Sequence, residues 1–369
     1  MKNILITGGA GFIGSHLADE LLRSGYNVRI LDNLSEQVHG PDASRPEYLN
    51  PEAELIIGDI RDKNAVKRSL EGIDAVFHFA AMVGVGQSMY QICDYTDVNN
   101  LGTAVLLEAL IENPVKKLVV ASSMSIYGEG LYTDGTGRKI QECSRNLADL
   151  KNHQWELADE GRMLTPQPTP EEKKPNLSSV YALSKYDQER LCLITGSAYN
   201  IPTTALRFFN VYGTRQALSN PYTGVLAIFA SRLLNNNPPI LFEDGNQKRD
   251  FVHVKDVARA CRLALESQKA NGEVFNIGSG NQYTVSEIAD KLANVMQKDI
   301  APEVSGKYRV GDIRHCFADL TKAREVLGFE PRIKFEDGLR ELAGWLEGQI
   351  AVDSVSQANQ ELALRGLTV

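Results

Sequence analysis

The chain has 369 residues, a formal net charge of −8 at pH 7 and a sequence pI near 5.4. This length is sufficient for one large α/β domain and a smaller second domain. The negative charge argues against general nucleic-acid binding, which needs a basic surface. No apolar run reaches the length of a membrane span, so we expect neither a nucleic acid nor a membrane as a partner.

The five cysteines are dispersed, and none lies in a CxxC spacing. An odd number of scattered cysteines indicates reduced thiols rather than a disulfide framework. Cys143 and His153 are too few to complete a metal site, so we expect no bound metal. Because no signal peptide precedes the first predicted strand, we expect a cytoplasmic location.

The first predicted element is a strand at 2–7, which leads through a glycine-rich turn into a helix that continues to Leu22. The turn reads GGAGFIG from Gly8 to Gly14, a G-x-x-G-x-x-G spacing. Glycine lets the backbone approach a pyrophosphate, and the N–H groups at the start of the helix then face the anion. Strand, glycine turn and helix together form the context that a dinucleotide-binding fingerprint requires.

Each of the next four predicted strands ends in residues suited to a ligand; the strands span 28–31, 55–57, 75–79 and 117–121. Asp32 can accept hydrogen bonds from a ribose 2′-hydroxyl and would repel a 2′-phosphate, which favours NAD over NADP. Asp59 could meet the adenine amino group, and the small Ala80 and Ala81 let a cofactor lie close. Ser122 to Ser125 follow the fifth strand. Because ligands bind beyond the carboxyl ends of parallel strands, we expect NAD at this edge of a helix-covered parallel sheet.

The helix that contains YALSK places Tyr181 and Lys185 one turn apart on the same face. A free tyrosine has a pKa of about 10, and a nearby lysine ammonium lowers that pKa by favouring the phenolate. Such a pair can exchange a proton with a substrate hydroxyl near neutral pH. A Tyr–Lys pair is also common on solvated helix faces, but beside a dinucleotide site it indicates hydride chemistry.

Two segments stand outside this alternating pattern. A polar, helix-poor insert lies between Gly128 and Ser179, near the expected mouth of the site, and three interpretations are open: a lid, an interface loop or a solvated excursion. The stretch from Gln349 to Val369 follows a helix predicted at 339–346, and we expect it to be a tail or a weak partner helix.

Several motifs follow one another across most of the chain: the glycine turn, FHFAA, SSMSIYG, YALSK, RFFNVYG and RDFVHVKDV. Together they resemble the extended short-chain dehydrogenases, in the nucleotide-sugar epimerase and dehydratase branch, from about Lys2 to about Trp345. The resemblance implies an α/β fold with a Rossmann-type doubly wound parallel sheet and a smaller, mixed α/β C-terminal substrate domain. It implies an NAD-binding domain at 1–209 with its insert at 129–179 and a returning segment at 250–275, a nucleotide-sugar-binding domain at 210–249 and 276–347, and a tail at 348–369.

The resemblance also implies roles for single residues. Tyr181 would be the base and acid, Lys185 its electrostatic helper, and Ser123 the partner of the reacting hydroxyl. Asn99 would brace the lysine region, and the paired guanidinium groups of Arg249 and Arg309 suit a diphosphate. The implied NAD-binding residues are Gly8, Gly11, Phe12, Ile13, Asp32, Asn33, Asp59, Ile60, Phe79, Ala80, Ala81, Asn99, Tyr181 and Lys185. The implied substrate-binding residues are Ser125, Asn210, Arg249, Arg309, Asp312 and Cys316.

Two positions after Ser123 separate the activities of that branch. In the family that this chain resembles, the 4,6-dehydratases have an Asp-Glu pair at these positions, and the decarboxylating enzymes have Glu at the second of them. This chain has Met124 and Ser125 instead. We therefore expect C4 epimerisation. Tyr181 would take a proton from a sugar hydroxyl while hydride passes to the nicotinamide, and the same hydride would return to the other face of the ketone.

The segments at 84–90 and 215–234, with the long insert, look most like those of dTDP-L-rhamnose 4-epimerases, which interconvert dTDP-L-rhamnose and dTDP-6-deoxy-L-talose. Because Cys316 is small, UDP-galactose and UDP-N-acetylglucosamine remain alternative substrates. Many UDP-galactose epimerases carry lysine where this chain has Val83, which makes UDP-galactose the weaker of these two alternatives. Alternatives of another kind are a net NAD(P)-dependent oxidoreductase and a non-catalytic NAD-sensing protein. We expect a homodimer, formed through the helix at 97–112 and the helix that carries Tyr181.

Overall fold

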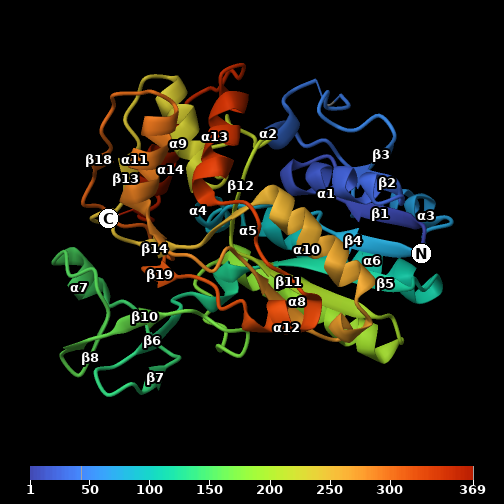
Figure 1. Cartoon of the computed structure of the whole chain (residues 1–369), viewed down its shortest axis with the longest axis horizontal. Helices are drawn as coiled ribbons and strands as arrows, with labels where there is room; N and C mark the ends of the chain where they lie inside the picture. The colour runs from blue at the N-terminus through green and yellow to red at the C-terminus, as the bar shows by residue number, and fades with distance from the viewer. Residues whose placement is uncertain (43, 369) are drawn as a thin grey trace.

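The computed structural model describes residues 1–42 and 44–368 (Figure 1). Seven parallel strands form the central sheet in the order β16-β11-β5-β4-β1-β2-β3. Their bounds are β1 Asn3–Thr7, β2 Asn27–Asp32, β3 Glu54–Ile57, β4 Ala75–His78, β5 Lys117–Ser123, β11 Thr203–Phe208 and β16 Val274–Ile277. The chain leaves β1 toward β2 and later returns to β4 on its other side. This reversal opens a crevice at the carboxyl ends of the two central strands, where open α/β sheets bind ligands.

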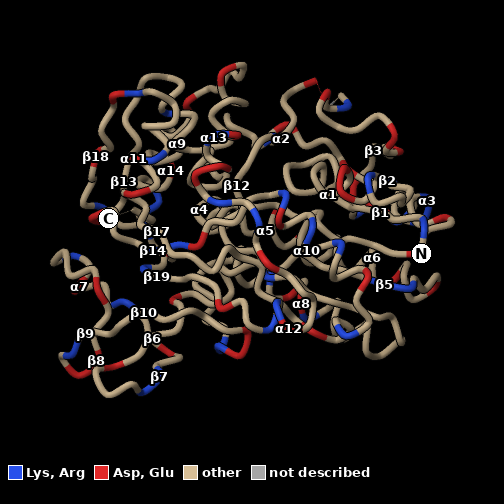
Figure 2. The backbone as a smooth tube through the Cα atoms, viewed as in Figure 1, with Lys and Arg blue, Asp and Glu red and all other residues tan. Residues whose placement is uncertain are grey.

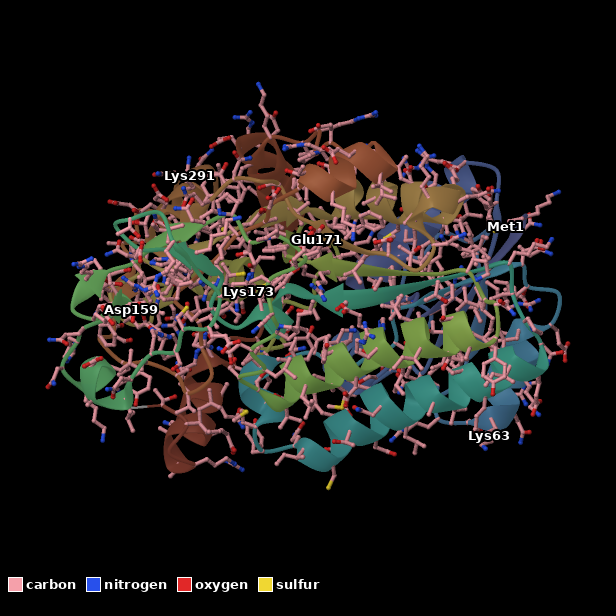
Figure 3. All side chains as sticks on the ribbon, turned by 90° about the horizontal axis from the view of Figure 1, so that it is seen from below. Met1, Lys63, Asp159, Glu171, Lys173 and Lys291 are labelled. Carbon is pink, nitrogen blue, oxygen red and sulfur yellow. The ribbon has the colours of Figure 1, made fainter. Side chains whose placement is uncertain are left out.

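Helices cover both faces of the sheet because alternate strand residues point to opposite sides and both sides are apolar. Ile4 and Ile6 face one core, whereas Leu5 between them faces the other. The first core is closed by α1 (Phe12–Arg23), α10 (Val254–Glu266) and α12 (Thr321–Leu327). The second is closed by α3 (Lys63–Leu70), α6 (Gly102–Glu112) and α8 (Val180–Ala198). Figure 3 shows α6 and α8 side by side on the outside of the molecule.

A smaller part of the molecule lies beyond the carboxyl ends of the strands, at the upper left of Figure 1. Its core is formed by α9 (Val225–Leu234), α11 (Val285–Val295) and α13 (Phe335–Leu346). Short strands beside this core form three small sheets, β12-β15, β13-β18 and β17-β14-β19. Their bounds are β12 (Asn210–Tyr212), β13 (Ile240–Leu241), β14 (Lys248–Arg249), β15 (Phe251–His253), β17 (Tyr283–Thr284), β18 (Glu303–Val304) and β19 (His315–Cys316). The short helical turns elsewhere are α2 (Glu36–His39), α4 (Val85–Ser88), α5 (Ile92–Tyr95), η1 (Thr96–Leu101), η2 (Met124–Tyr127) and η3 (Gln268–Ala270).

The insert projects at the lower left of Figure 1 and has its own small core around Tyr132, Leu157 and Leu164. It is a three-stranded sheet with a hairpin and one short helix among its described residues. The elements are β6 (Leu131–Thr133), β7 (Lys139–Ile140), α7 (Leu147–Lys151), β8 (Ala158–Asp159), β9 (Arg162–Met163) and β10 (Thr165–Gln167). The expectation of a helix-poor segment is confirmed, but the polar composition conceals this folded substructure.

The Rossmann-type sheet is confirmed, and the five strands predicted from the sequence match β1 to β5 within two residues at each end. The strands β11 and β16 were not predicted individually. β16 ends at Ile277 and so overlaps the predicted start of the second domain at 276. The residues after α13 form a further helix, α14 (Val355–Leu364), which packs on this chain and is not a free tail. Basic and acidic residues are interspersed along the chain (Figure 2), and no described helix has the length and hydropathy to cross a membrane.

Candidate active site

One continuous cavity of about 820 Å³ follows the carboxyl edge of the sheet and extends into the smaller part of the molecule. It brings together segments that are far apart in the sequence. Most of the predicted site residues line it: Gly8, Gly11, Phe12, Ile13, Asp32, Asn33, Ile60, Phe79, Ala80, Ala81, Ser123, Ser125, Tyr181, Lys185, Asn210, Arg249, Arg309 and Asp312. Asp59, Asn99 and Cys316 are not among the described residues that line it.

The glycine turn at one end of the cavity is a cradle that a side chain would fill. Gly8 has a φ of +69°, and a Cβ there would lie 2.8 Å from the Ala80 backbone nitrogen. A Cβ on Gly14 would lie 2.6 Å from the Gly8 carbonyl oxygen, so the start of α1 approaches the turn only because this residue is glycine. Gly11 is the N-cap of α1 and has no side chain to cap it, which leaves the first N–H groups of the helix available to an anion. The residues present therefore fit the pyrophosphate of a dinucleotide.

Asp32 stands at the end of β2 and is nearly buried beside this turn. Its Oδ2 accepts a hydrogen bond of 3.0 Å from the Ala10 N–H, and its Oδ1 accepts one of 2.9 Å from the Leu34 N–H. These bonds fix the carboxylate, and each oxygen keeps a lone pair for a further donor. A ribose diol is a donor of the required kind.

Asp59 is engaged with two neighbouring side chains. Its carboxylate accepts hydrogen bonds of 2.8 Å from both Nε and Nη2 of Arg61 and one of 3.1 Å from Asn33 Nδ2. The hydrogen bonds from Arg61 lower the pKa of Asp59 to about 2. Asp59 orders Arg61 and Asn33, and these two residues line the cavity whereas Asp59 itself does not. The adenine contact of Asp59 stays a prediction.

Ser123 ends β5, and Tyr181 lies in the first turn of α8, so the sheet and the helix present both hydroxyls to the same cavity. Ser179 caps α8 by accepting a hydrogen bond of 3.0 Å from the Ala182 N–H, and the Tyr181 N–H donates to Ser88 Oγ at 3.0 Å. Burial raises the pKa of the Tyr181 hydroxyl, and hydrogen bonding with Ser123 opposes that rise. Ser125 donates from its N–H and its hydroxyl to Ser123 Oγ at 3.1 and 2.9 Å.

Lys185 is buried, and burial lowers the pKa of its ammonium group to about 8. Its Nζ donates a hydrogen bond of 2.7 Å to Gln188 Oε1. For Tyr181, burial outweighs the opposing hydrogen bond with Ser123 and sets the upward direction of the pKa. That the Lys185 ammonium lowers this pKa stays a prediction. The pair is nevertheless brought to one cavity, as the helical spacing predicted.

A buried polar chain behind Lys185 was missed at the level of sequence. Gln188 Nε2 donates to Thr103 Oγ1 at 2.9 Å, and His78 Nε2 lies 2.8 Å from the same oxygen. Since Thr103 gives its own proton to the Asn99 carbonyl at 2.5 Å, the His78 proton resides on Nε2 and Nδ1 accepts from Thr7 Oγ1 at 2.8 Å. Burial lowers the pKa of His78 to about 3, so the ring is neutral. The one signal in the sequence is Gln188 itself, three residues after Lys185 on the same helix face.

Asn99 is fully buried and braces the loop after β4, and it does not contact Lys185 directly. Its Oδ1 accepts a hydrogen bond of 2.7 Å from the Met82 N–H, and its Nδ2 donates to the Met82 carbonyl at 3.1 Å. A further bond of 2.9 Å runs from Nδ2 to Ser184 Oγ, the residue before the lysine. Asn99 thus lies behind the residue that precedes Lys185, and it is not among the described residues that line the cavity.

Two arginines and a carboxylate converge at the other end of the cavity. Arg309 Nη2 lies 3.0 Å from Asp312 Oδ2, and Arg249 Nη2 lies 3.5 Å from Asp312 Oδ1. Burial opposes ionisation of Asp312, but Arg309, Arg249 and Arg145 outweigh it and lower the pKa of the carboxyl. Asn210 Oδ1 is buried with no hydrogen-bond partner among the described residues, although the side chain lines the cavity. An unpaired buried acceptor costs about 1–3 kcal/mol, so this oxygen indicates a ligand with a donor.

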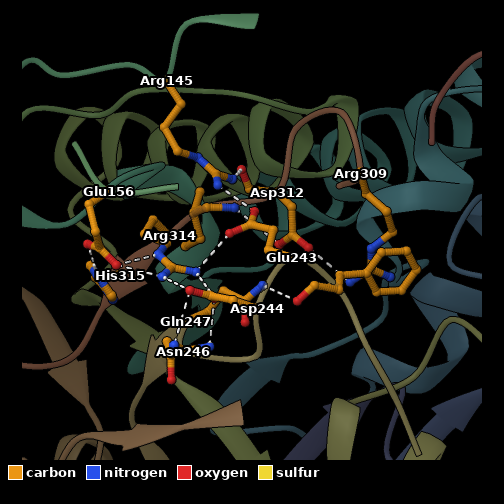
Figure 4. A network of polar contacts seen from close by, with 12 residues as sticks. Arg145, Glu156, Glu243, Asp244, Asn246, Gln247, Arg309, Asp312, Arg314 and His315 are labelled. Atoms are coloured by element: carbon orange, nitrogen blue, oxygen red, sulfur yellow. Dashed lines mark hydrogen bonds and ion pairs between the residues drawn. The ribbon is translucent and has the colours of Figure 1, made fainter. Parts of the chain in front are cut away.

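The insert contacts this end through a network of buried charges (Figure 4). Arg145 Nη2 donates to the Asp312 carbonyl at 2.7 Å, and the same guanidinium pairs with Glu243 and with Glu129. Arg314 forms ion pairs with Glu156 and Glu243 of 2.5 and 2.9 Å. The insert is therefore not a solvated excursion: it fixes the loop that carries Asp312.

Cys316 does not have the position that the size argument requires. It is fully buried in β19, with Sγ 3.8 Å from the Thr169 hydroxyl of the insert. The side chain points into the core and not into the cavity, so its small volume does not enlarge the described cavity.

The sequence matches the model of the NAD dependent epimerase/dehydratase family over residues 4–149 and 158–278. The dTDP-L-rhamnose 4-epimerase of Burkholderia thailandensis is 34% identical over 354 residues, which are 95% of this chain and 96% of that protein. The crystal structure of UDP-glucose 4-epimerase with UDP-glucose from Thermotoga maritima is 34% identical, with a TM-score of 0.76 over 94% of this chain and 98% of that chain. The complex of the Thermus thermophilus UDP-glucose 4-epimerase with NAD is 31% identical, with a TM-score of 0.75 over 94% of this chain and all of that chain.

The family match and the fit of the glycine turn to a pyrophosphate identify NAD as the cofactor. These three proteins are named as sugar-nucleotide 4-epimerases, which are isomerases. The chain belongs to the NAD dependent epimerase/dehydratase family and is an NAD-dependent enzyme of the isomerase class.

Proposed function

We propose that the protein is a nucleotide-sugar C4-epimerase that interconverts dTDP-L-rhamnose and dTDP-6-deoxy-L-talose. One observation carries the proposal: Ser123 and Tyr181 lie in a continuous cavity between the glycine turn at one end and the Arg249–Arg309–Asp312 group at the other. A sugar nucleotide held by its diphosphate at the arginine end would reach toward the two hydroxyls. The dinucleotide cradle lies on their other side.

Each of the site residues has a distinct role in such a reaction. NAD, when bound, accepts a hydride from the sugar and returns it. Tyr181 would take the proton from the C4 hydroxyl and later give it back, and Ser123 would hold the same oxygen by a hydrogen bond. The Lys185 ammonium supplies the nearby positive charge that a transient phenolate needs. The paired guanidinium groups of Arg249 and Arg309 would bind the diphosphate through several donors.

The positions after Ser123 favour epimerisation over loss of water or carbon dioxide. Met124 is buried, and the Ser125 hydroxyl is engaged with Ser123 at 2.9 Å. Neither can donate and accept protons as a carboxylic acid does. A ketone formed at C4 would therefore keep its substituents until the hydride returns.

The sugar is inferred from the loops that line the cavity. The segments 84–90 and 215–234, on which the similarity to dTDP-L-rhamnose 4-epimerases rests, both contribute lining residues. The relatives themselves differ, since one named for dTDP-L-rhamnose and one solved with UDP-glucose are each 34% identical to this chain. UDP-galactose and UDP-N-acetylglucosamine are the alternative substrates.

The decisive experiment follows the sugar nucleotides by NMR with dTDP-L-rhamnose, UDP-galactose and UDP-N-acetylglucosamine offered separately. The expected result is inversion at C4 of the dTDP sugar with no net reduction of NAD. Tyr181→Phe should reduce turnover about 10²- to 10⁴-fold while NAD and the sugar nucleotide still bind. Tyr199→Phe, at a half-exposed position of the chain, is the matched control. Full activity of Tyr181→Phe, or stoichiometric accumulation of reduced cofactor, would contradict the proposal.

A homodimer is also proposed, on the basis of the outer face formed by α6 and α8 (Figure 3). Leu183 and Ile194 of α8 are 47% and 58% exposed, and Leu101, the last residue of η1 before α6, is 51% exposed. Large apolar side chains gathered on adjoining helices indicate a protein interface. Light scattering should give about twice the chain mass of 40.7 kDa, and Ile194→Lys should halve it. Met163→Lys, at an equally exposed apolar residue of the insert, should leave the mass unchanged.

A further inference from the structure

The residues after α13 return across the cavity and are anchored on both sides of it. At the start, Asp353 pairs with Arg232 at 3.2 Å and accepts a hydrogen bond of 2.7 Å from Asn237 Nδ2. Both side chains of the Asp353–Arg232 pair are nearly buried, and Arg232 lines the cavity. This part of the chain is therefore fixed to the end of α9 before α14 begins.

One face of α14 lines the cavity. Its members are Val355, Ala358, Asn359 and Leu362, the i, i+3, i+4 and i+7 positions of one helical stripe. The three apolar members are buried, and Leu362 extends to within 3.3 Å of where a Cβ on Gly86 would lie. α14 thus packs on α4, whose Ser88 holds the Tyr181 backbone.

The residues that follow α14 reach the opposite wall. The Arg365 guanidinium lies 4.4 Å from the centre of the Tyr90 ring, and the Leu367 carbonyl accepts a hydrogen bond of 2.9 Å from the Val310 N–H. Val310 follows Arg309, one of the two arginines of the proposed diphosphate site. The segment from Asp353 to Leu367 therefore ties α9, α4 and the Arg309 loop together over one cavity.

Asn359 is the single polar member of the stripe. The hydrogen bonds at the ends of α14 involve Asp353 and Arg365, and within residues 1–42 and 44–368 none uses the Asn359 amide. Asn359 is half-buried and lines the cavity, so its amide is open to that space and available to a ligand. The amide offers both a donor and an acceptor, which suits a neutral group such as a sugar hydroxyl or a pyrimidine imide.

We propose that α14 is the roof of the substrate compartment and that Asn359 is a specificity-determining residue, which hydrogen-bonds the neutral part of the bound sugar nucleotide. This assignment rests on the proposed sugar-nucleotide substrate. The apolar members of the stripe exclude water above the sugar, and the Asn359 amide forms a hydrogen bond with one polar group of the sugar nucleotide.

The test compares Asn359→Ala with Gln360→Ala, an exposed neighbour on the same helix, in the NAD-loaded full chain. Asn359→Ala should raise KM for dTDP-L-rhamnose about tenfold, the effect of one hydrogen bond, with bound NAD and melting temperature unchanged. Gln360→Ala should match the wild type. A chain that ends at Gly348 should lose at least as much affinity and still retain NAD.

Calorimetric titration with dTDP and with dTDP-L-rhamnose locates the contact. Equal weakening of both ligands by Asn359→Ala places it on the pyrimidine, whereas weakening of the sugar nucleotide alone places it on the sugar. If Asn359→Ala and the shortened chain both bind and turn over as the wild type does, the assignment of α14 is wrong and the proposed function stands. If the wild type inverts none of the three sugars, the proposed function fails, and the titrations still test the roof.

Discussion

Lys185 donates its hydrogen bond of 2.7 Å to Gln188 Oε1, one turn further along α8. Through Gln188 the lysine joins the buried chain of Thr103, His78 and Thr7, which ends at the strand beneath the glycine turn. The ammonium group is thus held by the core of the sheet. Its burial lowers the pKa to about 8, so it remains largely protonated at neutral pH but titrates within a measurable range.

Gln188→Leu should weaken this arrangement by removing the acceptor of a buried ammonium group. We expect kcat to fall about tenfold with KM little changed, and the free energy of unfolding to fall by about 1–3 kcal/mol. Gln188→Glu should raise the Lys185 pKa, because a carboxylate at the same place favours the charged form. The alkaline limb of the pH–rate profile should therefore move upward in Gln188→Glu. An unchanged profile in both variants would show that Gln188 has a packing role only.

How far the sequence predicts this site depends on the kind of signal each residue carries. The glycine turn, Asp32 and the Tyr181–Lys185 pair were predicted because strand ends and helical spacing place them by local rules. Asp59 was predicted by the same rule, yet Arg61 and Asn33 occupy its carboxylate. Its position at a strand end could be read from the sequence, but the direction of its side chain could not.

Residues that meet only through long-range packing could not be predicted from local sequence patterns. Thr103 and His78 are ordinary polar residues in their own elements, and only the folded sheet brings them to Gln188. The same holds for α14, whose short apolar stripe gives no indication of the surface it covers. The prediction for Cys316 rested on its spacing from Asp312 in the sequence. In the structure β19 pairs with β14, and the Cys316 side chain lies in the core.

Asp32→Ser should relax the choice of cofactor. The carboxylate at the end of β2 would repel a 2′-phosphate, and serine removes that charge while keeping a hydrogen-bonding hydroxyl. We expect the ratio of NADP to NAD affinity to rise about tenfold or more, measured by titration of cofactor-depleted protein. Asp42→Ser, which removes an exposed charge in the loop that follows, should leave the ratio unchanged. If the ratio of NADP to NAD affinity is the same in Asp32→Ser as in the wild type, Asp32 does not contact the cofactor ribose.

The neutral His78 makes stability depend on pH. Burial lowers its folded pKa to about 3 from the ordinary 6.5, so protons bind the unfolded chain more tightly than the folded one. The contribution of His78 is fully present above pH 6.5 and is lost as the pH falls below that value. From this residue alone, the free energy of unfolding should decrease by about 2 kcal/mol between pH 6.5 and pH 5. His16, whose pKa burial lowers to about 4, has the same sign.

Urea unfolding at pH 7 and pH 5 measures this dependence. In His78→Gln the protein should be less stable at pH 7 but should lose less stability between the two pH values. His153→Gln, at an exposed position in the insert, is the control and should follow the wild type. An unchanged slope in His78→Gln would show that other groups determine the acid sensitivity.

Arg145→Met tests whether the insert supports the substrate end of the site. The guanidinium is nearly buried, pairs with Glu129 and Glu243, and donates to the Asp312 carbonyl at 2.7 Å. Its removal leaves two buried carboxylates without this partner, which costs about 3–5 kcal/mol for a buried pair. Because the loop that carries Asp312 loses its support, KM for the sugar nucleotide should also rise, with NAD binding unchanged.

The control for this prediction lies in the same insert. Arg138 pairs with Asp134 and Asp159, but its side chain is 62% exposed, and exposed ion pairs contribute little because water screens them. Arg138→Met should therefore leave both KM and the unfolding midpoint near the wild-type values. If Arg145→Met lowers stability but leaves KM unchanged, the insert stabilises the fold without shaping the site. If KM rises in Arg145→Met alone, the network in Figure 4 positions the Asp312 loop for the substrate, and the insert belongs to the binding machinery.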